Sequence, residues 1–245
     1  MPVEATSSKS NQRTATNPWR SPFPPEVCFE VTCTDDLPQA HLEPTEECIL
    51  SPRAVQSRRE HFALGRLAAR RALQRLNEQK RPIPAGARGE PLWPKGVCGS
   101  ITHTAGIAMA AVSKTPPGLA IGLDIEKSDR AISAGLGQRI CSPAEKEWAD
   151  RTTEPCALLS LFSAKEAIFK AFYPIDQVYL DFLDVHLCWA SQSQSFEAKL
   201  QRAASPVHPI GYRFQVTRTL QNGFVLCSVY LKPDHRASLD QNRPS

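Results

Sequence analysis

Two acidic residues separated by a single apolar residue stand near the middle of the chain. The segment 122–126 reads Gly-Leu-Asp-Ile-Glu, so Asp124 and Glu126 alternate with apolar neighbours. Side chains of a β-strand point alternately to its two faces, and this pattern therefore predicts a strand with both carboxylates on one face. Such a pair supplies the hard oxygen ligands that Mg²⁺ prefers. Taken singly, however, an Asp-x-Glu on a strand is more often a solvated sheet edge.

A third carboxylate and two amines follow in the segment 162–170, which reads Phe-Ser-Ala-Lys-Glu-Ala-Ile-Phe-Lys. Apolar residues at three- and four-residue spacings predict a helix here, and Lys165 falls within its buried stripe. A buried lysine requires a partner. Glu166 and Lys170 are four residues apart, a spacing that is also typical of a helix salt bridge worth about 0.3–0.5 kcal/mol.

We interpret the two segments as parts of one site. Asp124, Glu126 and Glu166 would hold Mg²⁺ together with water and phosphate oxygens, because this ion binds oxygen ligands and retains several waters. The two amines, Lys165 and Lys170, would offset charge that develops on a phosphate group.

Length and composition limit the class of protein. The chain has 245 residues, of which 41% are hydrophobic and 22% charged, as is ordinary for a globular protein with one sizeable core or two small fused domains. No apolar run approaches the ~20 residues of a membrane span, and the start of the chain lacks the apolar core of a signal peptide. The eight cysteines are scattered singly. We therefore expect a cytoplasmic protein with free, mostly buried thiols and no membrane partner.

Positive charge is concentrated between Arg53 and Lys95, where eleven Lys or Arg residues stand against three Glu. Such a segment suits an anionic partner, which could be nucleic acid, a phosphorylated cofactor or an acidic protein, and it is equally compatible with a solvated helix face. A basic nucleic-acid-binding module is thus an alternative function. It is less favoured because only Phe62 and Trp93 could supply the stacking aromatics of such a surface.

The remaining patterns predict an α+β protein with two similar halves, 25–118 and 119–232, between polar and poorly ordered tails at 1–24 and 233–245. Asn222-Gly223 is a strong hairpin signal. Expected helices cover 51–77, a short stretch from Ser142, and 154–172, which Pro174 would end. Expected strands cover 27–34, parts of 97–112 on either side of a turn at 104–106, 119–126, 183–189, 196–202, 212–219 and 224–232.

Together these motifs resemble the 4′-phosphopantetheinyl transferases of the large, monomeric type, including the enterobactin-pathway enzymes. The segment 122–126 is similar to the family's Gly-Ile-Asp-Ile-Glu element, with Leu123 in place of Ile or Val. The segment 162–170 is similar to its Lys-Glu helix. Further similar elements, in family order, are Gly65-Arg66, the segment 89–94, and the segment 99–103 with Thr102 in place of a serine.

The resemblance implies that the phosphopantetheine arm of coenzyme A is moved to a serine hydroxyl of an apo acyl or peptidyl carrier protein, which leaves adenosine 3′,5′-bisphosphate. It also implies two α+β halves related by a pseudo-twofold axis, with coenzyme A in the cleft between them. A monomer is expected, since one chain would supply the whole cleft. The implied carrier partner has an acidic surface, and secondary metabolism is the implied setting.

Roles for single residues also follow from the resemblance. Asp124, Glu126 and Glu166 would hold Mg²⁺, with Glu126 acting directly or through water, and Glu166 would also be the general base. Lys165 and Lys170 would stabilise the phosphates, and Lys170 would assist the leaving phosphate. The residues expected at the 3′-phosphate end or at further phosphates of coenzyme A are Arg58, Thr102, His103, Arg88 and Arg66, the last of which could instead brace the two halves.

Overall fold

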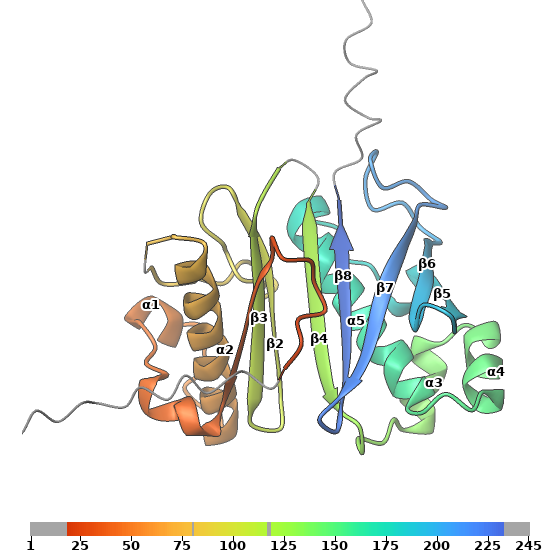
Figure 1. The fold of residues 1–245 in the computed structure, drawn as a ribbon, viewed down its shortest axis with the longest axis horizontal. Coiled ribbons are helices and arrows are strands. Elements are labelled where there is room, and N and C mark those ends of the chain that lie inside the picture. The colour runs from red at the N-terminus through yellow and green to blue at the C-terminus, as the bar shows by residue number, and fades with distance from the viewer. Residues whose placement is uncertain (1–18, 80, 117–118, 233–245) are drawn as a thin grey trace, which may run out of the picture.

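Two antiparallel sheets stand side by side in the computed structural model, which describes residues 19–79, 81–116 and 119–232 (Figure 1). One 20-residue helix packs on each sheet, α2 (Gln56–Arg75) on the first and α5 (Ala157–Asp176) on the second. The α+β class and the plan of two halves are therefore confirmed. The boundary expected at residue 118 and the tail expected at 233–245 fall on residues outside the described ranges.

The first half has three strands in the order β1-β3-β2. Alanine and leucine side chains of α2, such as Ala68, Ala72 and Leu73, pack against Ala110 and Val112 of the sheet. Small side chains on both surfaces let the helix lie close to the strands. The elements of this half are β1 (Cys28–Cys33), the 3₁₀ helix η1 (Thr34–Gln39), α1 (Pro44–Glu47), α2, β2 (Val97–Thr104) and β3 (Ile107–Lys114).

The second half has five strands in the order β4-β8-β7-β6-β5. Its helix α5 lies close to β4 because Gly122 has no side chain: a Cβ atom there would stand 1.9 Å from the carbonyl oxygen of Ala167. The remaining elements are β4 (Ala120–Lys127), α3 (Ala134–Ile140), α4 (Pro143–Arg151), the 3₁₀ helix η2 (Phe182–Asp184), β5 (Val185–Ala190), β6 (Ser195–Leu200), β7 (Arg213–Gln221) and β8 (Phe224–Leu231).

Side-chain hydroxyls join the two halves along β2 and β4, the facing edge strands of the two sheets. Ser100 Oγ accepts a hydrogen bond from the amide of Leu123 at 3.1 Å, and Thr102 Oγ1 accepts one from the amide of Ile125 at 3.2 Å. We call these contacts the hydroxyl seam. The seam fixes the register of β4, and therefore of Asp124 and Glu126, against the first half.

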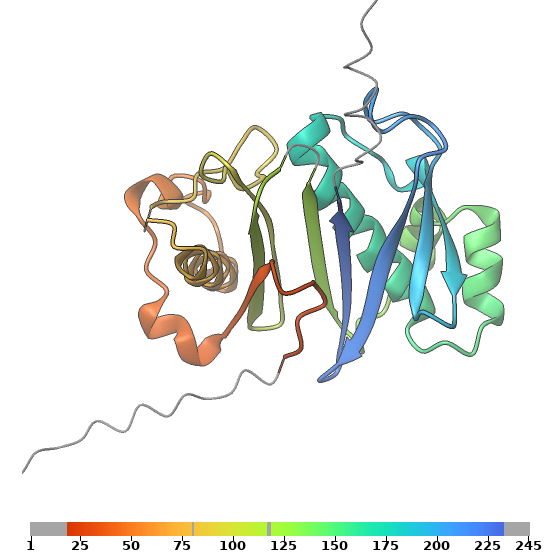
Figure 2. The same cartoon turned by 45° about the horizontal axis from the view of Figure 1, so that its top comes forward.

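A third core covers the faces of both sheets that lie opposite the helices. Phe23, Phe29 and Met109 from the first half pack there with Leu123 and Leu226 from the second. Figure 2 shows the first described residues, coloured red, crossing the junction of the two sheets. The expectation of a poorly ordered segment 1–24 is thus wrong for its end, since Phe23 is buried, whereas residues 1–18 lie outside the described ranges.

Helix ends were predicted less well than helices. Helix α2 begins at Gln56 rather than at Ser51, because Ser51 Oγ accepts from the amide of Arg53 in a preceding turn. Helix α5 continues through Pro174 to Asp176 and ends where Gln177 adopts a left-handed backbone conformation, with φ of 53°. The proline falls in the last turn, where the buried Phe172 and Tyr173 hold the helix on the sheet.

Two local signals were correct. Ser142 and Glu145 form the predicted capping box of α4, and Asn222-Gly223 forms the predicted tight turn between β7 and β8. All eight cysteines are free, as expected, but only Cys141 and Cys227 are buried. Within the described ranges, no helix combines the length and the apolar character needed to cross a bilayer.

Candidate active site

A buried carboxylate at the hydroxyl seam is the centre of the candidate site. Lys170 Nζ donates to Asp124 Oδ1 at 2.6 Å, and the hydroxyl of Thr102 donates to the same oxygen at 3.2 Å. The other oxygen, Asp124 Oδ2, is buried and has no hydrogen-bond partner within the described part of the chain. Strand β4, helix α5 and strand β2 thus meet at one carboxylate, which can still accept a ligand.

The second carboxylate of β4 is paired with an arginine. Glu126 Oε1 accepts from the guanidinium of Arg130, which also lies 4.8 Å above the ring of Phe162. Burial raises the pKa of Glu126, and the hydrogen bond from Arg130 opposes the rise. Sequence reasoning missed Arg130, although its position four residues after Glu126, just beyond the strand, was a possible signal.

Glu166 completes the acidic group from the facing helix. Burial raises its pKa, the charge of Lys170 opposes this, and Asp124 and Glu126 raise the pKa further. Lys170 forms its ion pair with Asp124 and not with Glu166, so the expected salt bridge within the helix is not formed. Glu166 therefore carries an ionisable carboxylate that no cation of the described chain neutralises directly.

The three predicted metal ligands, Asp124, Glu126 and Glu166, lie in one region, but their carboxylates do not converge on a common position. Within the described ranges, no three His, Cys, Asp or Glu side chains are arranged to surround a metal ion. Asp124 is turned to Lys170 and Glu126 to Arg130, so that side-chain cations balance two of the three carboxylates.

Lys165 lies elsewhere. Its ammonium donates to the carbonyl oxygens of Ile140 and Phe182 at 2.6 and 2.8 Å and to Glu145 Oε2 at 2.8 Å. All three N–H groups are thereby used, and its side chain is only 2% exposed. Burial lowers the pKa of Lys165, and Glu145 opposes the fall. The sequence argument that this lysine needs a partner is confirmed, but the partner is Glu145 and the structure does not bring Lys165 to Asp124.

Two histidines and an arginine stand at the edge of the first half. The ring of His103 stacks on that of His61, with centroids 5.3 Å apart, and the amide of Gly106 donates to His61 Nε2 at 3.1 Å. His103 keeps an exposed edge. Removal of the rest of its ring from water, together with the neighbouring His61, Lys170 and Arg58, lowers the pKa of His103 to about 4. Sequence reasoning missed His61, which stands one helical turn after Arg58.

The other two predicted cations differ in their surroundings. Arg66 is buried in the first half, where its Nε lies 3.9 Å from Glu46 Oε1 and its guanidinium lies 4.3 Å above the ring of Phe62. Burial lowers the pKa of Arg66 to about 10. Arg88 is exposed, and its guanidinium lies 5.6 Å above the ring of Tyr179 in the second half.

Much of the positive charge in the basic segment is neutralised. Arginines on two successive turns of α2 face acidic partners, and the resulting ion pairs are Arg70 with Glu46, Arg71 with Asp36, and Arg75 with Glu30. These arginines hold η1, α1 and β1 to the helix. The charge run is therefore in part a structural feature of the first half.

Two cavities flank α5. One, of about 170 Å³, opens beside Glu166 and is lined by Phe169, Tyr179 and Phe182 among others. A second, of about 240 Å³, lies between the halves, with Trp93 and Gly99 on one side and Ile121 and Ala171 on the other. The acidic group thus adjoins a recess with apolar walls, and the junction of the halves is hollowed.

Two family models match the chain. The model described as the 4′-phosphopantetheinyl transferase N-terminal domain matches residues 45–113, and the model described as the 4′-phosphopantetheinyl transferase superfamily matches residues 120–228. The first matched segment covers α2, β2 and most of β3 but not β1, and the second runs from β4 into β8.

Curated proteins agree with these models. The 4′-phosphopantetheinyl transferase Svp of Streptomyces mobaraensis is 38% identical over 173 residues, which cover 69% of this chain and 70% of that protein. The 4′-phosphopantetheinyl transferase PptT of Mycobacterium tuberculosis is 38% identical over 157 residues, or 63% and 68%. Enterobactin synthase component D of Salmonella typhi is 38% identical over 117 residues, or 46% and 47%.

Proposed function

Because this chain belongs to the 4′-phosphopantetheinyl transferase superfamily, we propose that it transfers the phosphopantetheine arm of coenzyme A to a serine of an apo acyl or peptidyl carrier protein. The bond from the serine oxygen to phosphorus forms as the bond from phosphorus to the bridging pyrophosphate oxygen breaks. Adenosine 3′,5′-bisphosphate leaves. The observation that carries the proposal is the buried Asp124, paired with Lys170 and Thr102 and adjoined by Glu166.

The donor atoms of the acidic group are of the kind that Mg²⁺ binds, although the three carboxylates do not surround a common point in this structure. Asp124, Glu126 and Glu166 offer only oxygen ligands, and Asp124 Oδ2 is buried without a hydrogen-bond partner in the described chain. Burial, and after it the charge of Asp124, raises the pKa values of Glu126 and Glu166. These three residues would hold the ion, with Glu126 acting directly or through water. When bound, the ion supplies positive charge to the pyrophosphate oxygens.

Glu166 is the proposed general base. A carboxylate whose pKa is raised by burial accepts a proton more readily than an exposed one. Glu166 has such a raised pKa and forms no ion pair within the described chain. Lys170, on the next turn of α5, is placed to stabilise the charge that develops on the leaving phosphate. It stays within 2.6 Å of Asp124 Oδ1 in the free protein.

The remaining cations suit the nucleotide end of coenzyme A. Arg58, His61 and His103 converge at the edge of the first half, and Arg88 lies over Tyr179. Thr102 is buried at the seam, so we assign it to the orientation of Asp124 and Lys170 rather than to an exposed phosphate. We retain Arg66 as a bracing residue within the first half.

The choice of carrier protein follows from one relative and from charge. One relative is named for enterobactin synthesis, so carriers of secondary metabolism, including peptidyl carriers, are the first to test. A carrier with an acidic surface would suit a protein with a formal net charge of +4. We expect the active form to be a monomer. No observation favours the nucleic-acid alternative, because α2 directs three of its arginines to acidic partners.

A carrier-loading assay tests the proposal. Purified apo carrier domains of fatty-acid, polyketide and peptide synthesis are mixed with the protein, coenzyme A and Mg²⁺, and their masses are measured. We expect at least one to gain a single phosphopantetheine group. Asp124→Asn should abolish this gain without loss of fold, whereas Glu147→Gln, on the exposed side of α4, should not. Unchanged mass for every carrier would refute the transferase activity.

A further inference from the structure

The buried ammonium group of Lys165 joins helix α5 to three neighbouring elements by hydrogen bonds. The three acceptors of Lys165 come from three separate elements: Ile140 ends α3, Glu145 lies in the first turn of α4, and Phe182 begins η2. A single side chain therefore sets the position of three segments against α5.

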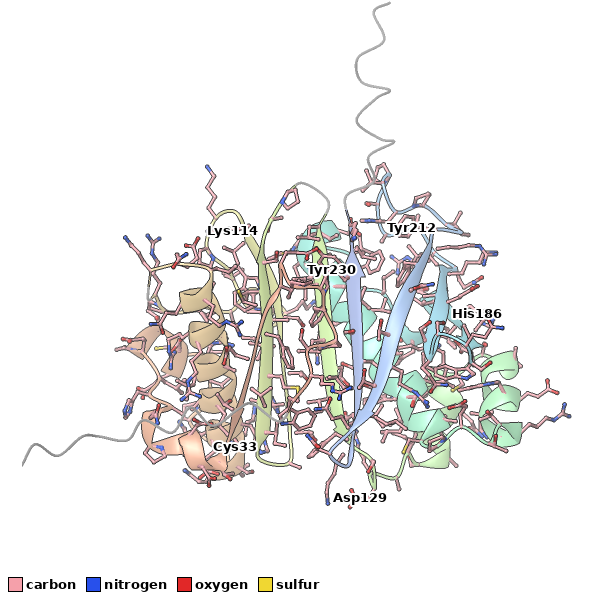
Figure 3. All side chains as sticks on the ribbon, viewed as in Figure 1. Cys33, Lys114, Asp129, His186, Tyr212 and Tyr230 are labelled. Atoms are coloured by element: carbon pink, nitrogen blue, oxygen red, sulfur yellow. The ribbon has the colours of Figure 1, made fainter. Side chains whose placement is uncertain are left out.

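The partner carboxylate is equally saturated. Glu145 has no exposed side-chain surface, its Oε2 accepts from the amide of Ser142 at 2.7 Å, and its Oε1 accepts from the amide of Leu187 at 2.8 Å. His186 Nδ1 stands 3.8 Å from Oε1 at the sheet edge near α4, where Figure 3 labels it. The ion pair thus also ties the edge strand β5 to α4.

A line of contacts leads from this pair to the acidic group. Phe182, whose carbonyl Lys165 holds, places its ring 6.0 Å from that of Phe162. The ring of Phe162 in turn supports Arg130, the residue that pairs with Glu126. Glu166 follows Lys165 directly on α5, and Lys165, Glu166 and Phe182 all line the recess of about 170 Å³.

A phosphate role for Lys165 is difficult to reconcile with these contacts. To reach a phosphate, its ammonium would have to leave three acceptors and expose a carboxylate that is wholly buried. Removing one partner of a buried ion pair leaves an uncompensated charge, which is more costly than losing both partners together.

We propose that Lys165 and Glu145 are positioning residues, whose buried ion pair holds Glu166 and the wall of its recess in place and makes no contact with the phosphates of coenzyme A. This inference rests on the proposed function. It assigns Glu145 a part in the reaction, and it changes the part of Lys165 from phosphate binding to support of its neighbour on the helix.

A double-mutant cycle tests the pairing. Lys165→Met, Glu145→Gln and the double variant are prepared in the full chain, and kcat and the KM for coenzyme A are measured for carrier loading. We expect each single variant to lower kcat at least tenfold while the KM changes less than threefold. The double variant should be at least tenfold more active than the product of the two single effects. The exposed ion pair of Lys146 with Asp150, on the same helix α4 as Glu145, is the matched control. Replacing each of its two residues should change kcat by factors that simply multiply in the double variant.

A direct phosphate contact by Lys165 would give a different pattern of kcat and KM values. A phosphate-binding Lys165 would raise the KM for coenzyme A at least tenfold in Lys165→Met, leave Glu145→Gln near normal, and give effects that multiply. Should Lys165→Met not fold, Glu145→Gln alone decides, because it keeps the lysine: a lower kcat at constant KM supports positioning, and an unchanged kcat overturns it.

Failure of the proposed function would be recognised separately. If the unaltered protein loads no carrier and binds no coenzyme A in calorimetry, the transferase proposal fails. The same four proteins are then compared by urea unfolding, which does not depend on activity. Effects on the unfolding midpoint that are not additive support the pairing, whereas additive effects overturn it.

Discussion

Each carboxylate of the acidic group is held differently. Asp124 pairs with Lys170 and Glu126 with Arg130, but Glu166 has no such partner in the described chain. Burial and the charges of Asp124 and Glu126 disfavour the ionised form of Glu166 and raise the pKa of its carboxyl group. A carboxylate kept in this state is costly for the fold and useful for accepting a proton.

Replacement of Glu166 by glutamine should separate these two effects. Loss of a general base lowers the rate of carrier loading by about 10²–10⁴-fold. Because burial raises the pKa of Glu166 above its ordinary value of 4.5, the ionised side chain destabilises the fold at neutral pH, and Glu166→Gln should raise the urea midpoint at pH 7.

The sign of the pH dependence checks this explanation. The gain in stability should vanish as the pH falls below 4.5, where Glu166 is protonated in both the folded and the unfolded chain. Urea unfolding of both proteins at pH 7 and pH 4 measures it. Normal loading by the variant, or a gain that persists at pH 4, would contradict the role given to Glu166.

His103 should be neutral throughout the physiological range. Its pKa of about 4 lies well below the ordinary 6.5, because packing removes part of the ring from water and His61, Lys170 and Arg58 add positive charge. Between these values the unfolded chain binds the proton first, so this residue lowers stability as the pH falls from 6.5 towards 4. NMR titration of the ring should show a midpoint near 4 that moves upward in His61→Ala, and a midpoint near 6.5 in the free protein would contradict the packing described.

At the scale of elements, the seam and the helix α5 determine where the carboxylates lie. Hydroxyls of β2 set the register of β4, and the missing side chain of Gly122 lets α5 approach until Lys170 reaches Asp124. The position of Lys170 relative to Asp124 therefore depends on a close contact between backbone atoms, not on a loop.

Gly122→Ala tests that contact. The added methyl group would stand 1.9 Å from the carbonyl oxygen of Ala167, so helix and strand must separate, at a cost of about 3 kcal/mol in the free energy of unfolding. Urea unfolding measures the change. Gly135→Ala on α3, where an added Cβ meets nothing within 4 Å, is the control and should be neutral or slightly stabilising. Equal stability of the two variants would contradict close packing at Gly122.

Much of the arrangement at this scale could be predicted from sequence. Alternation identified the strand of Asp124 and Glu126, helical spacing identified α5, and short-range signals identified the capping box of Ser142 and the turn at Asn222. These features depend on residues close together in the chain. Their prediction needs only the geometry of one element.

Contacts between distant segments could not be predicted. The sequence indicated that Lys165 needs a partner but not that Glu145, twenty residues earlier, supplies it. Thr102 was expected at an exposed phosphate because its motif suggested one, whereas the meeting of β2 and β4 buries it. Pro174 was expected to end α5, but the buried Phe172 and Tyr173, which directly precede it, hold the last turn on the sheet and outweigh a local signal.

At the scale of the molecule, the two halves share a core. Phe23 and Phe29 precede the first helix, yet they pack in one cluster with Leu123 and Leu226 of the second sheet. The cluster lies opposite both helices. Neither half can bury this face without the other, so we expect the two to unfold together.

Phe23→Ala should weaken both halves at once. Deleting a buried phenylalanine ring costs about 3–5 kcal/mol. Far-ultraviolet circular dichroism and tryptophan fluorescence should report one common transition at a lower urea concentration. Val207→Ala, at a side chain 63% exposed, is the control and should leave the transition where it is. Two separate transitions, or an unchanged midpoint, would show that the segment does not join the halves.

The hydroxyl seam also bears on the order of synthesis. An unpaired sheet edge is a template for association with other chains. Strand β2 leaves the ribosome before β4, so its edge stays open until Leu123 and Ile125 are available to Ser100 and Thr102. Once the seam has formed, β2 and β4 cover each other's edges. The seam that orients Asp124 thus also removes two sheet edges at which nascent or crowded copies of the protein would aggregate.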